Sequence, residues 1–387
     1  MSSINSKFTK QIQKLNVKSF ENKSIYGASP PAVFVSHGTY PIVDAGPMVP
    51  PFLSGNDSMM LEDSKQLLKM SVQEIASKRS KLIRASVKVN IKQKIENPFI
   101  LKSQELARSK KAVDIEVWFN KSFQTKPQFD DVLSSHGPSY ELKNFDIIEN
   151  PRVPKKIDYI TYDTDALVKD AIFELWNAKI PDEHIMRLLS IGLLGTEKKR
   201  TLVPTRWSIT AIDDLIGKNL IKKILDFPEI NEIEIFNGCV LGNHFEIILI
   251  PRSFSFELIE IWQTAGKPKI AFDWEFASGK KKYSNLAGGY YAARLGVLEY
   301  LQRNKRQAAI YIIREIRKEY FIPLGVWVVR EGVRAALNNK SKTFGSIDGA
   351  LSDASKRIYT PLNEWKHKNR LMKEIKCQKT FSNYIVK

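Results

Sequence analysis

The sequence has 387 residues, of which 43% are hydrophobic and 26% are charged. This length suggests two or three domains, and a composition close to the globular average excludes a largely disordered chain. Lys and Arg outnumber Asp and Glu by 60 to 42, which gives a net charge of +18. The numbers of basic and acidic residues are 5 and 1 in 1–25, 30 and 31 in 26–265, and 25 and 10 in 266–387. The two basic ends indicate a polyanionic partner, although a lysine-rich surface that only confers solubility has the same composition.

Cysteine content and hydropathy limit the cellular location. Cys239 and Cys377 are the only cysteines, too few for a four-cysteine zinc site or a disulfide framework, so no structural zinc is expected. The stretch 24–43 carries no Asp, Glu, Lys or Arg, but prolines and polar residues interrupt it, which excludes a membrane helix. No apolar signal-peptide segment precedes it. We expect a cytoplasmic protein that does not contact membranes.

Hydrophobic spacing predicts elements along the first two thirds of the chain. We expect, in order, a loose basic tail (1–25), an extended Pro- and Gly-rich segment (29–51) with a strand at 32–35, a helix at 59–87, a strand at 113–119, and helices at 164–178, 181–194 and 208–226. A hairpin should follow, with strands at 233–236 and 240–250 joined by Asn237-Gly238, a strong turn signal.

A boundary between two regions is placed at 266–268, where a Gly-Lys-Pro sequence occurs. Beyond it we expect a strand at 270–276, a helix at 285–304 and an apolar run at 307–317, whereas the run 325–337 fits no single pattern. Helices and strands mix without a regular βαβ period. The chain therefore predicts an α+β fold in two regions, with short flexible termini.

The densest polar segment is residues 195–214, GTEKKRTLVPTRWSITAIDD. Backbone N–H groups at the start of a capped helix point towards an anion, and an arginine there can bind it through two parallel hydrogen bonds. The candidate phosphate-binding or nucleic-acid-binding residues are Lys198, Lys199, Arg200, Thr205, Arg206 and Ser208. Asp213 and Asp214 are candidate metal ligands or general bases. An ordinary capped helix with a solvated basic turn explains the same pattern.

Asp273-Trp-Glu275 places two carboxylates on one face of a predicted strand. Such a pair holds Mg²⁺ or Mn²⁺ in many phosphodiester-cleaving sites, but an exposed acidic strand face is also common. Further candidate phosphate-binding residues are Lys280, Lys281, Lys282 and Arg294, the last of which follows Gly288-Gly289.

His37-Gly38-Thr39 resembles an element with which some ADP-ribosyltransferases hold NAD. No matching tyrosine and glutamate pattern follows it. An NAD-dependent transferase is therefore a weaker alternative than a metal-dependent nuclease.

The C-terminal tail places Gln378, Phe381 and Tyr384 at i, i+3 and i+6, which one 3₁₀ turn brings to the same side. Two rings beside an amide resemble the peptide by which replication and repair proteins bind the sliding clamp PCNA. The tail departs from that pattern at Phe381, where Leu, Ile or Met is commoner, and at Ile385, which replaces a second aromatic residue.

Most of the chain resembles the archaeal Nre DNA repair proteins. The resemblance is carried by Ser29–Val35, Tyr40-Pro41, Gly46-Pro47 and above all LVPTRWSIT at 202–210. It implies an N-terminal region over 26–265, a basic C-terminal region over 266–375 and a clamp-binding tail over 376–387. Many relatives begin with a cysteine-rich, zinc-finger-like segment. This sequence has no cysteine before Cys239, so no DNA contact through such a finger is expected.

These observations favour a nucleoid-associated repair factor. In this interpretation PCNA binds Gln378, Phe381, Tyr384 and Ile385, and DNA binds the basic surface through its phosphates. The first alternative is an enzyme that acts on nucleic acid or a nucleotide, with Asp213, Asp214, Asp273 or Glu275 as catalytic groups. The second is a protein-interaction scaffold that binds the clamp but not DNA.

Overall fold

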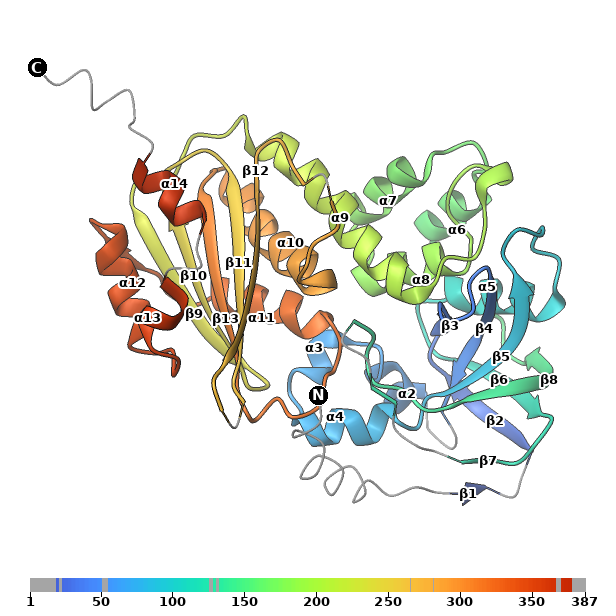
Figure 1. Ribbon diagram of the computed structural model, residues 1–387. Helices are drawn as coiled ribbons and strands as arrows, with labels where there is room; N and C mark the ends of the chain where they lie inside the picture. The colour runs from blue at the N-terminus through green and yellow to red at the C-terminus, as the bar shows by residue number, and fades with distance from the viewer. Residues whose placement is uncertain are drawn as a thin grey trace, which may run out of the picture. The chain divides into compact units, whose positions relative to one another are not determined.

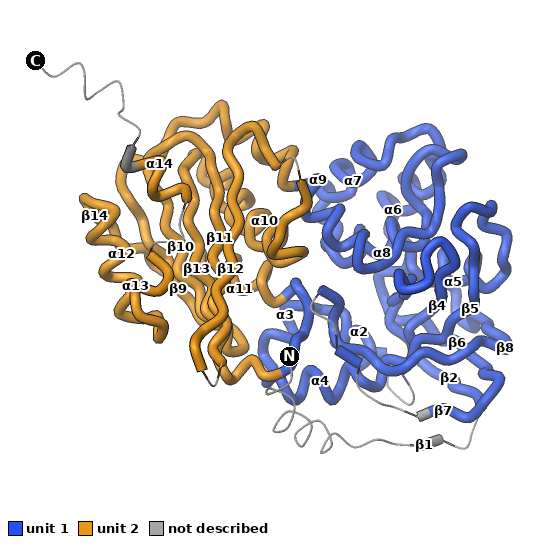
Figure 2. Tube along the Cα trace, viewed as in Figure 1, with its two compact units in different colours: residues 1–216, 322–327 blue, residues 217–321, 328–387 orange. Residues whose placement is uncertain are grey.

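The computed structural model describes residues 19–20, 23–50, 55–124, 128–129, 132–264, 266–280, 282–366 and 370–377. The chain forms two compact units, unit 1 (1–216 and 322–327) and unit 2 (217–321 and 328–387), shown in Figure 2. It passes from the first to the second within helix α9 (Thr205–Ile224). Each unit is built on a six-stranded mixed sheet with helices around it (Figure 1), which confirms the predicted α+β class.

The sheet of unit 1 has the strand order β2-β6-β8-β5-β4-β3, in which β5 and β8 run parallel and the other neighbours antiparallel. Its strands are β2 (Ser24–Ser29), β3 (Val33–Val35), β4 (Ile42–Val49), β5 (Ile83–Asn90), β6 (Val113–Phe119) and β8 (Ser139–Ile147), and β1 (Ser19–Phe20) pairs separately with β7 (Phe123–Gln124). Strand β6 alternates strictly between buried and half-buried residues, which confirms the prediction for 113–119.

Short helices surround this sheet. They are α2 (Gly55–Met60), α3 (Ser64–Leu67), α4 (Val72–Arg79), α5 (Pro98–Arg108), α6 (Lys155–Tyr162), α7 (Val168–Asn177), α8 (Asp182–Ser190) and the 3₁₀ helix η1 (Glu197–Lys199), followed by α9. Helices α7, α8 and α9 confirm the predicted helices at 164–178, 181–194 and 208–226, although each begins or ends at different residues.

The prediction of one helix over 59–87 is wrong. Ser71 and Glu74 form a capping box that starts α4 as a separate helix, and α4 ends at Arg79. The following residues form β5, where Ile83 and Ala85 are fully buried in the core of the sheet. The pairing of β5 with β4 and β8 is long-range, so local spacing does not reveal it.

The Pro- and Gly-rich segment 29–51 contains the predicted strand as β3 and continues into β4. The pairing of β4 with β5 is interrupted at Gly46 and Pro47, between the pairs Ala45–Val87 and Met48–Arg84, and its register is the same on both sides. A Cβ atom on Gly46 would lie 2.1 Å from the carbonyl oxygen of Ala85. Only glycine fits this close approach of two backbones, so Gly46 belongs to the packing of the sheet.

The sheet of unit 2 has the order β12-β11-β13-β10-β9-β14, in which β11 and β13 run parallel. Its strands are β9 (Ile233–Val240), β10 (Asn243–Ile250), β11 (Ser255–Trp262), β12 (Lys269–Phe276), β13 (Ala309–Ile316) and β14 (Lys342–Phe344). Helices α10 (Ala287–Asn304) and α11 (Trp327–Leu337) cover one face, and α12 (Ile347–Ser355), α13 (Leu362–Trp365) and α14 (Leu371–Cys377) cover the other (Figure 1). The predictions for 270–276 and 285–304 are confirmed by β12 and α10. The residues predicted as the boundary, 266–268, lie between β11 and β12.

The hairpin is confirmed, but its turn is not where Asn237-Gly238 predicts. Both residues lie inside β9, opposite Glu246 and Phe245 of β10. The turn is Leu241-Gly242, with φ of 50° and 76°, and a Cβ on Gly238 would lie 3.1 Å from the backbone of Ala336. Gly238 therefore allows α11 to pack closely against the strand.

A buried carboxylate anchors α14 to this sheet. The Glu257 side chain on β11 is fully buried and accepts hydrogen bonds from the N–H groups of Arg370 and Leu371, each at 2.8 Å. The Arg370 guanidinium lies 5.0 Å from the ring centre of Trp274. Burial raises the pKa of Glu257 to about 7, although the two N–H donors favour the charged form. This contact fixes the position of α14, the last helix before the C-terminal tail.

Because the pKa of Glu257 is higher in the folded than in the unfolded protein, its contribution to stability is present at low pH and is lost as pH rises through about 7. We expect Glu257→Gln to gain stability relative to the unsubstituted protein between pH 5 and 8, by up to about 3 kcal/mol. Urea unfolding at both pH values measures the difference. Glu364→Gln, at an exposed position of α13, is the matched control. An E257Q difference that does not change with pH contradicts the assignment.

Candidate nucleic-acid interface

The hydroxyls at the start of α9 hold unit 1 together. The Val35 N–H donates to Thr205 Oγ1 at 2.9 Å, and the Ser190 and Thr205 hydroxyl oxygens lie 3.1 Å apart. Ser208 is fully buried and its hydroxyl donates to the Thr205 carbonyl at 3.0 Å. Two predicted phosphate ligands, Thr205 and Ser208, thus form hydrogen bonds within the protein that join β3, α8 and α9.

The predicted basic turn divides into a structural arginine and exposed lysines. The guanidinium of Arg200 donates to the carbonyls of Gly195, Thr161 and Asp163 at 2.9, 2.7 and 2.6 Å. Burial lowers its pKa, against the opposing effect of Asp163 and Glu197. Lys198 and Lys199, on η1, are exposed.

An aromatic pair that the sequence analysis did not single out lies at the start of α9. The Trp207 ring, on the first turn of α9, and the Tyr40 ring, between β3 and β4, have centroids 4.9 Å apart and planes inclined by 54°. Trp207 is 44% exposed and Tyr40 is 48% exposed. Both residues belong to the motifs that carry the family resemblance. An aromatic residue directly after Arg206 at a helix start is the signal that marks the pair.

Ile91 brings three chain segments together at this pair. Its N–H donates to the Pro41 carbonyl at 3.1 Å, and its carbonyl accepts from the Thr201 hydroxyl at 2.7 Å. Lys92 follows Ile91 and is exposed. The segment that carries Tyr40, the segment that carries Lys92 and the segment between η1 and α9 are therefore joined by hydrogen bonds in unit 1.

The two carboxylates of β12 share a buried face, as their spacing predicts. Asp273 is 4% exposed and accepts from Lys280 at 2.5 Å, from Ser284 at 2.7 Å and from the N–H groups of Trp274 and Asn285 at 2.9 and 3.0 Å. Burial by itself raises the pKa of Asp273, but these hydrogen bonds outweigh it and lower the pKa below its ordinary value. The alternative interpretation, an exposed acidic strand face, is therefore wrong.

Glu275 forms an ion pair with Arg294 at 2.6 Å, and both side chains are almost fully buried. Arg294 also lies against Gly217 of α9, where a Cβ would be 3.1 Å from its Nη2 atom. This arginine is therefore enclosed within unit 2. Arg294, a predicted phosphate ligand, thus neutralises Glu275, a predicted catalytic carboxylate.

The remaining predicted residues are dispersed. Asp213 is fully buried and Asp214 is half-buried on α9, and Lys282 is exposed before α10. Lys281 and the predicted clamp-binding residues Gln378, Phe381, Tyr384 and Ile385 lie outside the described residues. Within the described ranges, no three His, Cys, Asp or Glu side chains are grouped so that they would hold a metal ion.

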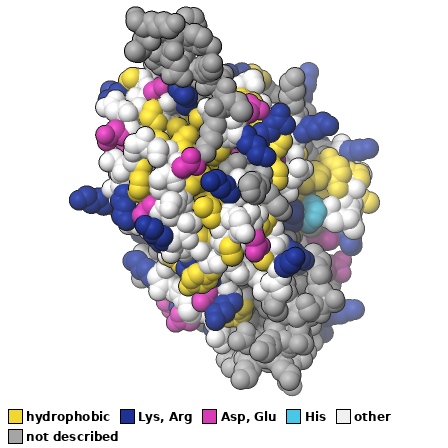
Figure 3. Space-filling model, turned by 60° about the vertical axis from the view of Figure 1, so that its left-hand side comes forward, with side chains coloured by type: hydrophobic (Ala, Val, Ile, Leu, Met, Phe, Trp, Pro, Cys, Tyr) yellow, Lys and Arg dark blue, Asp and Glu magenta, His cyan; other side chains and the backbone are white. Residues whose placement is uncertain are grey.

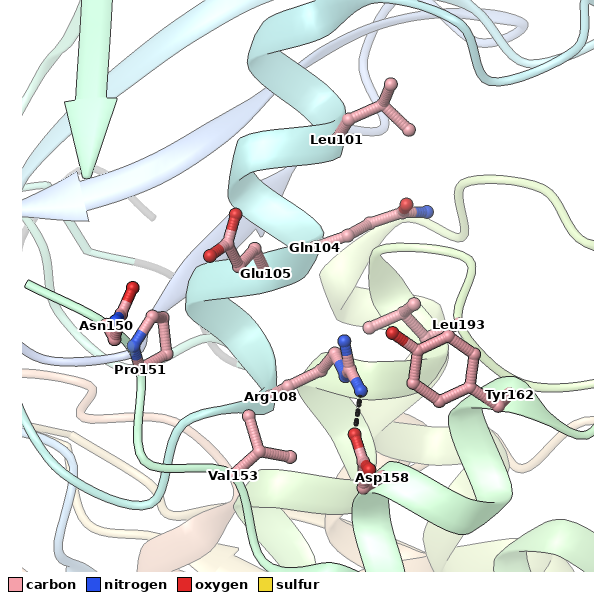
Figure 4. A pocket seen from close by; sticks show the side chains of 10 residues that line it. All are labelled: Leu101, Gln104, Glu105, Arg108, Asn150, Pro151, Val153, Asp158, Tyr162 and Leu193. Carbon is pink, nitrogen blue, oxygen red and sulfur yellow. Dashed lines mark hydrogen bonds and ion pairs between the residues drawn. The ribbon is translucent and has the colours of Figure 1, made fainter.

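A groove of about 450 Å³ lies between α5 and α6 in unit 1 (Figure 4). Arg108 pairs with Asp158 and lies 4.8 Å from the ring centre of Tyr162. Glu105 adds a second carboxylate to the lining. Since Asp158 already neutralises Arg108, the groove has little attraction for a phosphate.

The surface of the molecule is basic but mixed. Lys and Arg side chains are spread over the face in Figure 3, with hydrophobic and acidic side chains between them. No helix in the described part of the chain has the length and apolar character needed to cross a membrane.

Comparison with known proteins identifies the family. The family model for the archaeal Nre N-terminal region matches residues 3–266, and that for the Nre C-terminal region matches 275–384. The chain is 40% identical to the DNA repair protein NreA of Archaeoglobus fulgidus, over 88% of this chain and 87% of that protein. It is 34% identical to NreB of the same organism (91% and 90%) and 31% identical to NreA of Haloferax volcanii (91% and 87%). No solved structure matches it significantly. The chain belongs to the archaeal Nre family of DNA repair proteins.

Proposed function

We propose that this repair protein is recruited by the sliding clamp PCNA through residues 378–385 and binds DNA through its basic surface. The tail sequence carries the proposal, because Gln378, Phe381 and Tyr384 have the spacing of a clamp-binding peptide. Aromatic residues within an otherwise polar segment favour a role in binding a partner. We expect the protein to act in the cytoplasm, at the nucleoid.

The attachment of α14 supports this role for the tail. Leu371 and Met372 pack into the hydrophobic core of unit 2, and Glu257 holds the N-terminus of the helix. The tail begins directly after Cys377, the last residue of α14. A peptide that follows an anchored helix links whatever it binds closely to the folded protein.

The cations of unit 2 support DNA binding through its lysines more than through its arginines. Arg294, Arg314 and Arg357 pair with Glu275, Glu260 and Glu246, carboxylates that lie on the sheet. These three arginines therefore neutralise buried acids. The exposed lysines of unit 2 carry positive charge that attracts a polyanion without reading its sequence.

We expect the tail to account for clamp binding. The double variant Phe381→Ala/Tyr384→Ala, and a chain that ends at Lys376, should each lose at least about tenfold in affinity for purified PCNA, since both hydrophobic contacts are removed. Isothermal titration measures the affinity. Ser382→Ala/Asn383→Ala, within the same tail but outside the pattern, should bind as the full chain does. Equal binding by all four proteins contradicts the proposal.

DNA binding should depend on salt. If two or more lysines neutralise phosphates, the affinity for duplex DNA should fall at least about tenfold between 50 and 200 mM NaCl. Fluorescence anisotropy of a labelled duplex gives the slope, and circular dichroism over the same range shows whether the fold is unchanged. An affinity that does not change with salt would contradict the proposed phosphate contacts.

A further inference from the structure

The aromatic pair of unit 1 presents apolar surface to solvent on a rigid support. Trp207, Tyr40 and Ile42 are 44%, 48% and 48% exposed. The Thr39 carbonyl and hydroxyl close a tight loop: the Ile42 N–H donates to the Thr39 carbonyl at 3.0 Å, and the Thr39 hydroxyl donates to the Ile42 carbonyl at 2.5 Å. Because the loop and the start of α9 are both fixed by hydrogen bonds, a ligand would pay little ordering entropy to use these rings.

Cations outnumber anions on the chain segments that adjoin those of the rings. The cations on the adjoining segments are Lys88, Lys92, Lys94, Lys198, Lys199 and Arg206, and the anions are Asp44, Glu96 and Glu197. Lys88 lies 3.4 Å from Asp44 and Lys94 lies 3.7 Å from Glu96, yet both lysine side chains are more than 70% exposed, at 73% and 79%. The balance favours an anionic ligand that also has flat apolar groups.

We propose that Tyr40 and Trp207 form a stacking site for unpaired bases of single-stranded DNA, with the surrounding lysines on its phosphates. The proposal rests on the DNA binding proposed above and names the form of DNA that unit 1 takes. Bases in a duplex are stacked on one another and cannot reach the rings, whereas an unpaired strand offers a base face and a phosphate for each nucleotide. A protein partner matched to these rings would not need the lysines.

The test compares one labelled oligonucleotide, 20 thymidines long, with a 20-base-pair duplex in anisotropy titrations at 50 mM NaCl. Stacking on an aromatic ring is worth about 5- to 100-fold in affinity for one base. Trp207→Ala and Tyr40→Ala should each lower the affinity for the single strand by that factor and the affinity for the duplex by less than about twofold. Trp207→Phe should retain most of the affinity. Tyr159→Ala is the matched control, because Tyr159 lies on α6 and is 62% exposed.

The outcomes separate this inference from the proposed function. Equal losses on single strand and duplex, or no loss on either in variants with unchanged thermal unfolding, would overturn the stacking site while leaving DNA binding in place. Failure of the unsubstituted protein to bind either form overturns both. Tighter binding of a uridine oligonucleotide overturns the assignment to DNA. Clamp binding should be unchanged in every variant, since none alters the tail.

Discussion

The hydrogen bond from the Val35 N–H to the Thr205 hydroxyl is the contact on which the candidate interface depends. It joins the end of β3 to the first residue of α9, so the loop after β3 and the first turn of α9 emerge side by side. Tyr40 and Trp207 lie on those two segments. Valine in place of threonine would keep the shape but lose the acceptor, leaving a buried N–H without its partner. The LVPTRWSIT motif thus has a structural threonine and an exposed tryptophan two residues apart.

Unit 2 shows why a carboxylate pattern on a strand is a weak sign of catalysis. Glu246, Glu257, Glu260, Asp273, Glu275 and Glu315 are all buried on one sheet. Each accepts from a cation or from backbone N–H groups, as when Arg357 binds both oxygens of Glu246 at 2.7 and 2.8 Å. A buried charge without such partners costs several kcal/mol. The donors around Asp273 are therefore explained by burial alone, and a metal ion is not needed to account for them.

The sequence predicts those elements whose hydrophobic spacing matches the side that they bury in the folded protein. Strand β6 and helix α7 bury one side, and their hydrophobic period predicts them. The prediction fails where distant residues determine the structure. The sequence of β5 is similar to a continuation of α4. Gly238 has the pattern of a turn, although it makes room for α11. The same limit applied to the site. Arg200 and Arg294 look like phosphate ligands in the sequence, because nothing local shows that carbonyls of 161 and 163 or the carboxylate of Glu275 surround them.

Tyr40 and Trp207 are each about half exposed, which is compatible with the clamp recruitment proposed above. One or two stacked bases contribute only a few kcal/mol, too little to hold DNA against competing sites at cellular concentrations. The proposed recruitment changes that requirement, because a clamp on DNA that also binds residues 378–385 would raise the effective concentration of DNA at the protein. A deep pocket would then bring no advantage, and it would slow release from the strand. Under that proposal exposed rings are sufficient, and in unit 1 the hydrogen bond from Val35 to Thr205 fixes the two segments that carry them.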